Sequence, residues 1–177
     1  RGCGIMRTPR HEPRTGMHDT RDTNARIRVA TAADAPRLAL VGRATFLETY
    51  AENIDGDDVV AYCEVGHSAA AYEELLAEAD ARVWLAEAAA TRAPVGYVVL
   101  TRPDLPGAEA GDLEVRRLYV LQSYHGRRLG AELLGRAVAA ARESGAKRVL
   151  LGVYTKNPRA FAFYERMGFR RIGSRDF

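Results

Sequence analysis

Tyr164 is the first residue whose type and position could support chemistry. It lies in the stretch NPRAFAFYERMGF, residues 157–169, between an Asn-Pro start and a Gly-Phe stop. A phenol is protonated at neutral pH and can donate its proton to a reacting group. Apolar residues at helical spacing are more often core, however, and Phe161 and Phe163 fit that interpretation. The segment alone leaves both explanations of Tyr164 open.

A second stretch, LYVLQSYHGRRLGAELL at residues 118–134, has the order strand, glycine-containing turn, helix. The first turn of a helix leaves backbone N–H groups without partners and carries partial positive charge, which together favour anion binding. Gly126 and Gly130 lack Cβ atoms and permit close approach, while Arg127 and Arg128 add charge. A tight turn with two solvated arginines is an equally good explanation. The stretch matches neither a Walker loop nor GxGxxG.

Composition limits the classes of protein that these stretches can belong to. The chain has 177 residues, 47% of them hydrophobic and 28% charged, with a net charge of +3, as expected for one globular domain. The sequence predicts no membrane span, because no apolar run approaches about 20 residues. The mild charge does not argue for nucleic acid. Two cysteines and four scattered histidines predict no metal site and fit a reducing cytoplasm.

The first 25 residues are rich in Arg, Pro, Gly and Thr and have few large apolar side chains. We expect a disordered leader, or residues that are not native to the protein, with Met6 or Met17 as possible starts. A basic arm that binds nucleic acid is the sharper alternative. The ordered domain is predicted to occupy residues 26–177.

Hydrophobic periodicity predicts the elements that position Tyr164 and the turn. The expected order is β-α-α-β-β-β-α-β-α-β, with an antiparallel meander in the middle and a parallel strand–helix–strand unit at 113–153. The result is a mixed α/β sheet with helices on both faces. The predicted strands are IRVAT, RVWLAEAA, PVGYVVLT, LEVRRLYVL, RVLLGVY and FRRIGSRDF. The first predicted helix begins at Asp34. The others cover residues 59–79, with an interruption near Gly66, residues 126–144 and residues 157–167.

Taken together, LEVRRLYV, YHGRRLGAELL and NPRAFAFYERMGF, in this order and spacing, resemble the GNAT N-acetyltransferase superfamily. The resemblance extends from Ile27 to the end of the chain. It implies a mixed, mostly antiparallel sheet of about six or seven strands flanked by about four helices, with acetyl-CoA as co-substrate and no metal. The segment RATFLETY with Asn53 looks most like the branch of bacterial spermidine/spermine acetyltransferases.

Site residues follow from the same resemblance. The family loop usually reads Gln/Arg-x-x-Gly-x-Gly/Ala, so His125 replaces Gln/Arg and Arg128 replaces the first glycine, while Gly130 matches. The pyrophosphate is expected on N–H groups of residues 126–131, pantetheine along the preceding strand and beside Asn157, and the 3′-phosphate near Arg166. The implied coenzyme A site comprises Leu118, Tyr119, Val120, His125, Gly126, Arg127, Arg128, Leu129, Gly130, Ala131, Asn157, Ala160, Tyr164 and Arg166.

The chemistry implied is direct attack of a neutral amine on the thioester in a ternary complex. Glu114 is the candidate general base, acting through water, and an exposed strand carboxylate is the alternative. A backbone N–H near Val120 is the candidate oxyanion donor, and Tyr164 would protonate the leaving thiolate.

The acceptor pocket is expected from 45–58 and 102–112, with Phe46, Tyr50, Asn53 and Glu114 as candidate substrate-binding residues. Acidic residues in the first segment favour a polyamine, although solvated helix ends explain them equally well.

A small amine or polyamine is therefore the expected acceptor. The alternatives are protein N-terminal or lysine acetylation, antibiotic acetylation, and a non-catalytic acyl-CoA-binding regulatory module. One departure from the family is that the chain stops at Phe177 within the first strand of the closing hairpin. Either the residues of the final strand are missing, or that edge is completed otherwise, for instance by a second subunit in a homodimer.

Overall fold

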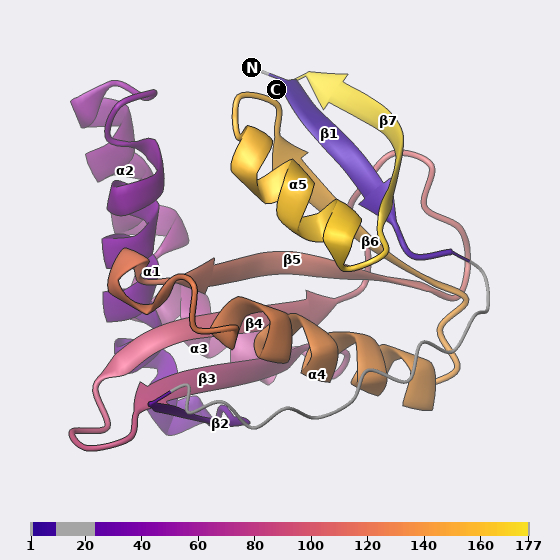
Figure 1. The fold of residues 1–177 in the computed structure, drawn as a ribbon. Helices are drawn as coiled ribbons and strands as arrows, with labels where there is room; N and C mark the ends of the chain where they lie inside the picture. Colours follow the sequence, from indigo (N-terminus) through magenta and orange to yellow (C-terminus); the bar gives the residue numbers. More distant parts are fainter. Residues whose placement is uncertain (1, 10–23, 177) are drawn as a thin grey trace. The chain divides into compact units, whose positions relative to one another are not determined.

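The computed structural model describes residues 2–9 and 24–176 (Figure 1). Within them the strands form a seven-stranded sheet in the order β2-β3-β4-β5-β6-β1-β7. The strands are β1 (Gly2–Arg7), β2 (Ala25–Val29), β3 (Arg82–Ala88), β4 (Pro94–Thr101), β5 (Asp112–Val120), β6 (Arg148–Tyr154) and β7 (Arg170–Asp176). The helices are α1 (Ala35–Tyr50), α2 (Gly56–Gly66), α3 (Ala69–Ala77), α4 (Leu129–Glu143) and α5 (Pro158–Arg166).

The chain divides into two compact units, and β4, β5 and α4 each pass from one unit to the other. Unit 1 contains the described residues within 1–19, 100–116 and 138–177. Unit 2 contains the described residues within 20–99 and 117–137. Each unit has its own buried cluster, so each is described by itself below.

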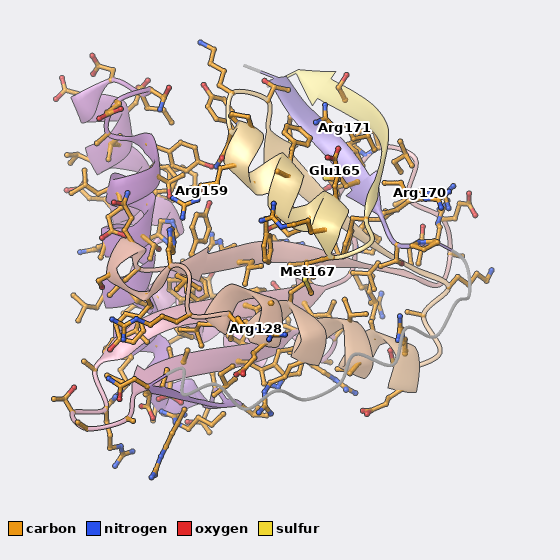
Figure 2. All side chains as sticks on the ribbon, in the orientation of Figure 1. Arg128, Arg159, Glu165, Met167, Arg170 and Arg171 are labelled. Carbon is orange, nitrogen blue, oxygen red and sulfur yellow. The ribbon has the colours of Figure 1, made fainter. Side chains whose placement is uncertain are left out.

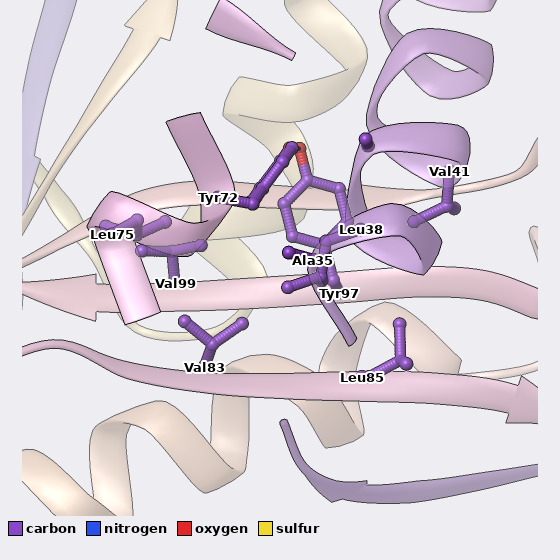
Figure 3. Packing of buried hydrophobic residues seen from close by; sticks show 10 residues of the cluster. Ala35, Leu38, Val41, Tyr72, Leu75, Val83, Leu85, Tyr97 and Val99 are labelled. Carbon is purple, nitrogen blue, oxygen red and sulfur yellow. The ribbon is translucent and has the colours of Figure 1, made fainter. Parts of the chain in front are cut away.

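The core of unit 2 lies where α1 and α3 pack on β3 and β4 (Figure 3). Val83 and Leu85 alternate along β3, and successive side chains of a strand point to opposite faces, so both reach the same helices. The buried cluster comprises Ala35, Leu38, Ala39, Val41, Tyr72, Leu75, Val83, Leu85, Tyr97 and Val99. This packing holds α1 and α3 on the strands that precede β5.

An ion-pair network fixes the start of α1 to the edge of unit 2. The guanidinium of Arg28, on β2, lies 2.7 Å from Asp34 and 2.9 Å from Glu87 on β3, and Arg37 of α1 lies 2.8 Å from Glu87. The hydrogen bonds from Arg28 hold the pKa of Asp34 far below its usual range. Both carboxylates are buried and fully paired, which makes them costly to disturb.

Unit 1 corrects the prediction for the N-terminal segment. Residues 2–7 do not form a disordered leader but the strand β1, which pairs antiparallel with β6 on one side and β7 on the other. Met6 is fully buried, and Ile5 packs on Leu105 and Leu150. No local pattern predicts this strand, because its pairing partners β6 and β7 lie far away in the sequence. Residues 10–23 of the predicted leader lie outside the described part.

The strand β1 also bears on the expectation that the final strand of the sheet is missing. The position beside β7 is occupied by β1 of the same chain, so the described sheet does not need a second subunit there. The homodimer stays a prediction, but a missing strand no longer supports it.

The predicted fold class is otherwise confirmed. β5 and β6 pair in parallel from Asp112 with Arg148 to Val115 with Leu151, as the strand–helix–strand prediction requires. The predicted helical region at 59–79 is two helices, α2 and α3, which meet at the predicted interruption. Ser68 caps α3 by accepting a hydrogen bond from the Ala71 N–H, which explains the restart.

Candidate active site

The turn between β5 and α4 contains two left-handed backbone conformations within three positions. Gly126 has φ +79° and Arg128 has φ +63°. Glycine adopts this region freely, whereas a residue with a Cβ is disfavoured there by about 1–2 kcal/mol. Arg128 thus holds a conformation suited to glycine, the residue that the resembled loop usually has at this position. The left-handed conformation therefore occurs at a position where this sequence departs from the motif.

Two side chains of the turn make contacts with the residues just before it. The Nε2 atom of His125 lies 2.8 Å from the carbonyl oxygen of Val120, so its N–H tautomer donates to the end of β5. The guanidinium of Arg127 lies 5.1 Å from the ring centroid of Tyr124. Figure 2 labels Arg128, which is exposed at the beginning of α4. The contacts of His125 and Arg127 brace the turn.

This turn fits a pyrophosphate. The N–H groups in the first turn of α4 have no acceptor within the helix and lie at the positive end of its dipole. Leu129 is buried and anchors the helix, while residues 126–128 are exposed. Gly130 and Ala131, in the first turn, have small side chains that leave room for an anion near the backbone. The predicted pyrophosphate residues therefore share one structural element.

The strand segment before the turn is held closely by β4. A Cβ built on Gly96 would lie 2.9 Å from the carbonyl oxygen of Tyr119 and 3.3 Å from Cα of Val120. The N–H of Leu121 donates to the carbonyl of Val95 at 2.9 Å. The absence of a side chain at Gly96 thus sets the position of Leu118–Val120, the segment predicted to pair with pantetheine.

In unit 1 the predicted residue Asn157 lies at the start of α5, and Tyr164 lies in its last turn. The side-chain oxygen of Asn157 caps the helix by accepting the N–H of Ala160 at 3.0 Å, so the NH₂ end of its amide is the part that can donate to a ligand. Tyr164 is half-buried, with its ring 5.9 Å from Phe169 and 5.1 Å from Phe163. These rings fix the tyrosine without covering it.

The remaining side chains of α5 differ in burial. Phe161 is buried under the guanidinium of Arg171, 3.9 Å from its ring centroid. Figure 2 shows Glu165 beside Arg171, with their side chains 3.2 Å apart. Arg166, the candidate for the 3′-phosphate, is exposed in the last turn.

Glu114 is not the exposed strand carboxylate of the alternative interpretation. Its side chain is 6% exposed, and Oε2 accepts the N–H of Asp104 at 2.7 Å. A buried carboxylate with a backbone donor keeps a defined orientation, which a general base requires. Asp104 lies in the segment 102–112, which was expected to line the acceptor pocket.

The acceptor residues predicted on α1 belong to a cluster of neighbouring aromatic rings in unit 2. Phe46 lies 4.6 Å from Tyr50 and 4.5 Å from Tyr62, and 5.3 Å from His67. Asn53, beyond the end of α1, is exposed.

Sequence reasoning missed the polar part of this cluster. The Nδ1 atom of His67 lies 2.8 Å from the hydroxyl of Tyr72, and that hydroxyl donates to Tyr97 at 2.8 Å. The guanidinium of Arg117 lies 5.2 Å from the ring centroid of Tyr72. No local pattern links residues on α2, α3, β4 and β5, although Arg117 directly precedes the recognised LYV segment.

The electrostatics of this cluster are dominated by burial and by arginine. Burial, together with the charges of Arg117 and Arg43, lowers the pKa of His67 to about 3, so the imidazole is neutral at pH 7. Burial likewise raises the pKa of Tyr72 and of Tyr97, which stay protonated. The cluster is therefore neutral apart from its arginines.

The two units hold different parts of the predicted site. Unit 2 contains the turn, the segment 118–120 and the aromatic cluster. Unit 1 contains Glu114, Asn157 and Tyr164. Within the described part, no helix has the length and apolar character to cross a bilayer. No group of three or more potential metal ligands occurs among those residues either.

Comparison with known proteins agrees with the motifs. Residues 44–169 match the model of the acetyltransferase (GNAT) family. An uncharacterized N-acetyltransferase of Mycobacterium tuberculosis is 35% identical over 144 residues, which cover 81% of this chain and 88% of the relative.

Solved structures share the fold. The PaiA N-acetyltransferase of Thermoplasma acidophilum, in complex with coenzyme A, superposes with a TM-score of 0.73 at 21% identity, covering 86% of this chain and 99% of that one. The aminoglycoside N-acetyltransferase AAC(6′)-Iy, also with CoA, has a TM-score of 0.59 at 14% identity, covering 86% and 91%. The chain belongs to the acetyltransferase (GNAT) family, whose enzymes transfer acyl groups from coenzyme A to amines.

Proposed function

We propose that this protein transfers the acetyl group of acetyl-CoA to the primary amine of a small molecule, by direct attack in a ternary complex. The observation that carries the proposal is the turn at residues 126–128. It adopts two left-handed conformations ahead of α4 even though one falls on an arginine. A shape kept against a backbone cost of about 1–2 kcal/mol indicates a functional demand on the turn.

The residues that would hold the co-substrate form three groups. The N–H groups at 126–131 would bind the pyrophosphate, and the backbone of Leu118–Val120 and the amide of Asn157 would bind pantetheine. Ala160 would border the cofactor and Arg166 would meet the 3′-phosphate. The co-substrate supplies an acetyl group on a thioester, which an uncharged amine can attack.

Two side chains would move protons. A primary amine with a pKa near 10 is mostly protonated at pH 7, so a base must take a proton before it can attack. Glu114 would accept this proton through water, because its carboxylate is fixed by Asp104. Tyr164 would donate its phenolic proton to the departing sulfur.

The acceptor is proposed at the level of a small primary amine, with Phe46, Tyr50 and Asn53 at its site. The acidic residues that favoured a polyamine are partly used within the protein. The carboxylate of Glu48 accepts the N–H of Gln122 at 2.9 Å, and Asp55 caps α2 by accepting the N–H of Asp57 at 3.0 Å. These contacts weaken the case for a polyamine.

Release of free thiol from acetyl-CoA, measured over a panel of polyamines, amino acids, aminoglycosides and peptide N-termini, tests the proposal. We expect turnover with at least one small amine, and loss of at least tenfold in kcat in both Glu114→Gln and Tyr164→Phe. Turnover restricted to peptides would replace the proposal by protein acetylation. Coenzyme A binding without thiol release for any amine would replace it by a regulatory acyl-CoA-binding module.

A further inference from the structure

Arg117 is a largely buried guanidinium without a carboxylate partner among the described residues. It lies on β5 and is largely withdrawn from water. The side chains that act on it electrostatically are the phenols of Tyr97, Tyr72 and Tyr62, and none of them is a carboxylate. Withdrawing a cation from water costs several kcal/mol unless it is paired. Stacking over Tyr72 returns only about 0.5–2 kcal/mol. Arg28, which is also in unit 2 and is more exposed, pairs with two buried carboxylates.

The position of Arg117 suits contact with the acceptor rather than with the pyrophosphate. Side chains alternate along a strand, so Arg117 and Tyr119 lie on one face of β5, and Tyr119 stacks on Tyr97 at 5.9 Å. That face meets Tyr62 of α2 and Tyr72 of α3. Arg117 also precedes Val120 by three residues, about 10 Å of extended chain, and the turn begins only after Val120.

A second arginine, Arg43, adds another positive charge to this region. The Nε of Arg43 donates to the carbonyl of His67 at 3.0 Å, and both Arg43 and Arg117 act electrostatically on that imidazole. His67 stays neutral, and the tyrosines stay protonated, so nothing within the cluster balances the two cations. A ligand with several ammonium groups would be repelled here.

We infer that Arg117 binds a carboxylate of the acceptor, so that the substrate class of this enzyme is an amine that carries a carboxylate, such as an amino acid. The inference rests on the proposed acetyl transfer. A guanidinium offers paired N–H donors that match the two carboxylate oxygens, and such charge-assisted pairs are strong when desolvated. The tyrosine hydroxyls around Arg117 would provide the polar wall, and Leu118–Val120 would place the thioester next along the strand.

The test uses pairs of amines that differ only in the carboxylate: L-phenylalanine with phenethylamine, and γ-aminobutyrate with propylamine, together with spermidine. We expect the carboxylated member of at least one pair to have a kcat/KM at least tenfold higher, and spermidine to be a poor acceptor. Arg117→Gln should abolish this preference by raising the KM of the acceptor while the KM of acetyl-CoA stays unchanged. No preference in any pair, or a preference that survives in Arg117→Gln, would overturn the inference.

The neighbouring Arg116 is the matched control. It is exposed on the same strand, and Arg116→Gln should keep the preference. Arg117→Lys keeps the charge without the paired donors and should show a reduced preference; it replaces Arg117→Gln as the deciding variant if circular dichroism shows that the latter is unfolded. A rise in the KM of acetyl-CoA instead would assign Arg117 to the phosphates and overturn the inference.

Failure of the proposed acetyl transfer would be recognised separately. If no amine is acetylated, calorimetric titration of the wild-type protein with L-phenylalanine and γ-aminobutyrate, in the presence of coenzyme A, tests the carboxylate site alone. Binding of either that is lost in Arg117→Gln and kept in Arg116→Gln supports the site. The absence of binding for both overturns it.

Discussion

At the scale of single residues, Tyr164 shows how packing and chemistry can be combined in one side chain. Phe163 and Phe169 contact its ring edge to face, while the side chain remains partly accessible. The ring of Tyr164 is therefore oriented by the aromatic neighbours Phe163 and Phe169.

Tyr164→Phe is expected to lower kcat by about 10²-fold or more, because a positioned general acid contributes about 10²–10⁴. Thermal unfolding and the dissociation constant of coenzyme A should stay the same, since only the hydroxyl is lost. Tyr154→Phe, at the end of β6, provides a matched control that should keep wild-type turnover. An unchanged kcat in Tyr164→Phe would remove the residue from the mechanism.

Arg128 stands where the family motif usually has glycine, and its backbone is left-handed. Arg128→Gly should raise the free energy of unfolding by about 1 kcal/mol, because glycine adopts φ near +63° without strain. Chemical denaturation measures this change. Arg127→Gly is the control and should be neutral or destabilising, since Arg127 is not in the left-handed region. Destabilisation by Arg128→Gly would show that the arginine side chain contributes more than the strain.

At the scale of elements, the cluster that joins α2, α3 and β4 contains a histidine that is neutral at pH 7. The pKa of His67 is lowered to about 3 by burial and by Arg117 and Arg43. In the unfolded chain it returns to about 6.5. Between these values the unfolded state binds a proton that the folded state does not, so stability is lost as pH falls from about 6.5 towards 3.

The wild-type protein should therefore lose about 2 kcal/mol of unfolding free energy between pH 7 and pH 5 through this residue. His67→Gln should be less stable at pH 7 but should lack this part of the pH dependence. Urea denaturation at the two pH values gives the comparison. An equal loss in both proteins would mean that His67 titrates normally in the fold.

At the scale of the whole molecule, the N-terminal strand completes unit 1. β1 lies between β6 and β7 and buries Met6 entirely. Such a strand links the first residues of the chain to its last element. The prediction of a leader failed here because pairing partners 140 residues or more away in the sequence leave no local signal.

Met6→Ala should reduce the free energy of unfolding by about 2–4 kcal/mol, as for other buried methionines. Leu40→Ala is the control, because Leu40 is 64% exposed on α1 and should change stability by less than about 0.5 kcal/mol. Chemical denaturation of both variants decides the matter. An unchanged free energy of unfolding in Met6→Ala would mean that residues 2–7 are not a buried strand and belong to the predicted leader.

The sequence by itself determined the elements whose hydrophobic pattern is local: β5, β6, α4 and α5, the parallel pairing of β5 with β6, and the family. It also indicated the turn between β5 and α4, because a strand, a glycine and a helix follow one another within about ten residues. These features depend on neighbours in the chain.

Only the tertiary structure decided what depends on distant residues. It placed β1 in the sheet, buried Glu114 on the N–H of Asp104, and brought Arg117 among tyrosines from three other elements. Burial and the charges within a few ångströms set the properties of such groups, and neither can be read from residue type or spacing. That is why the sequence favoured a polyamine, whereas the folded chain leads us to infer an acceptor with a carboxylate.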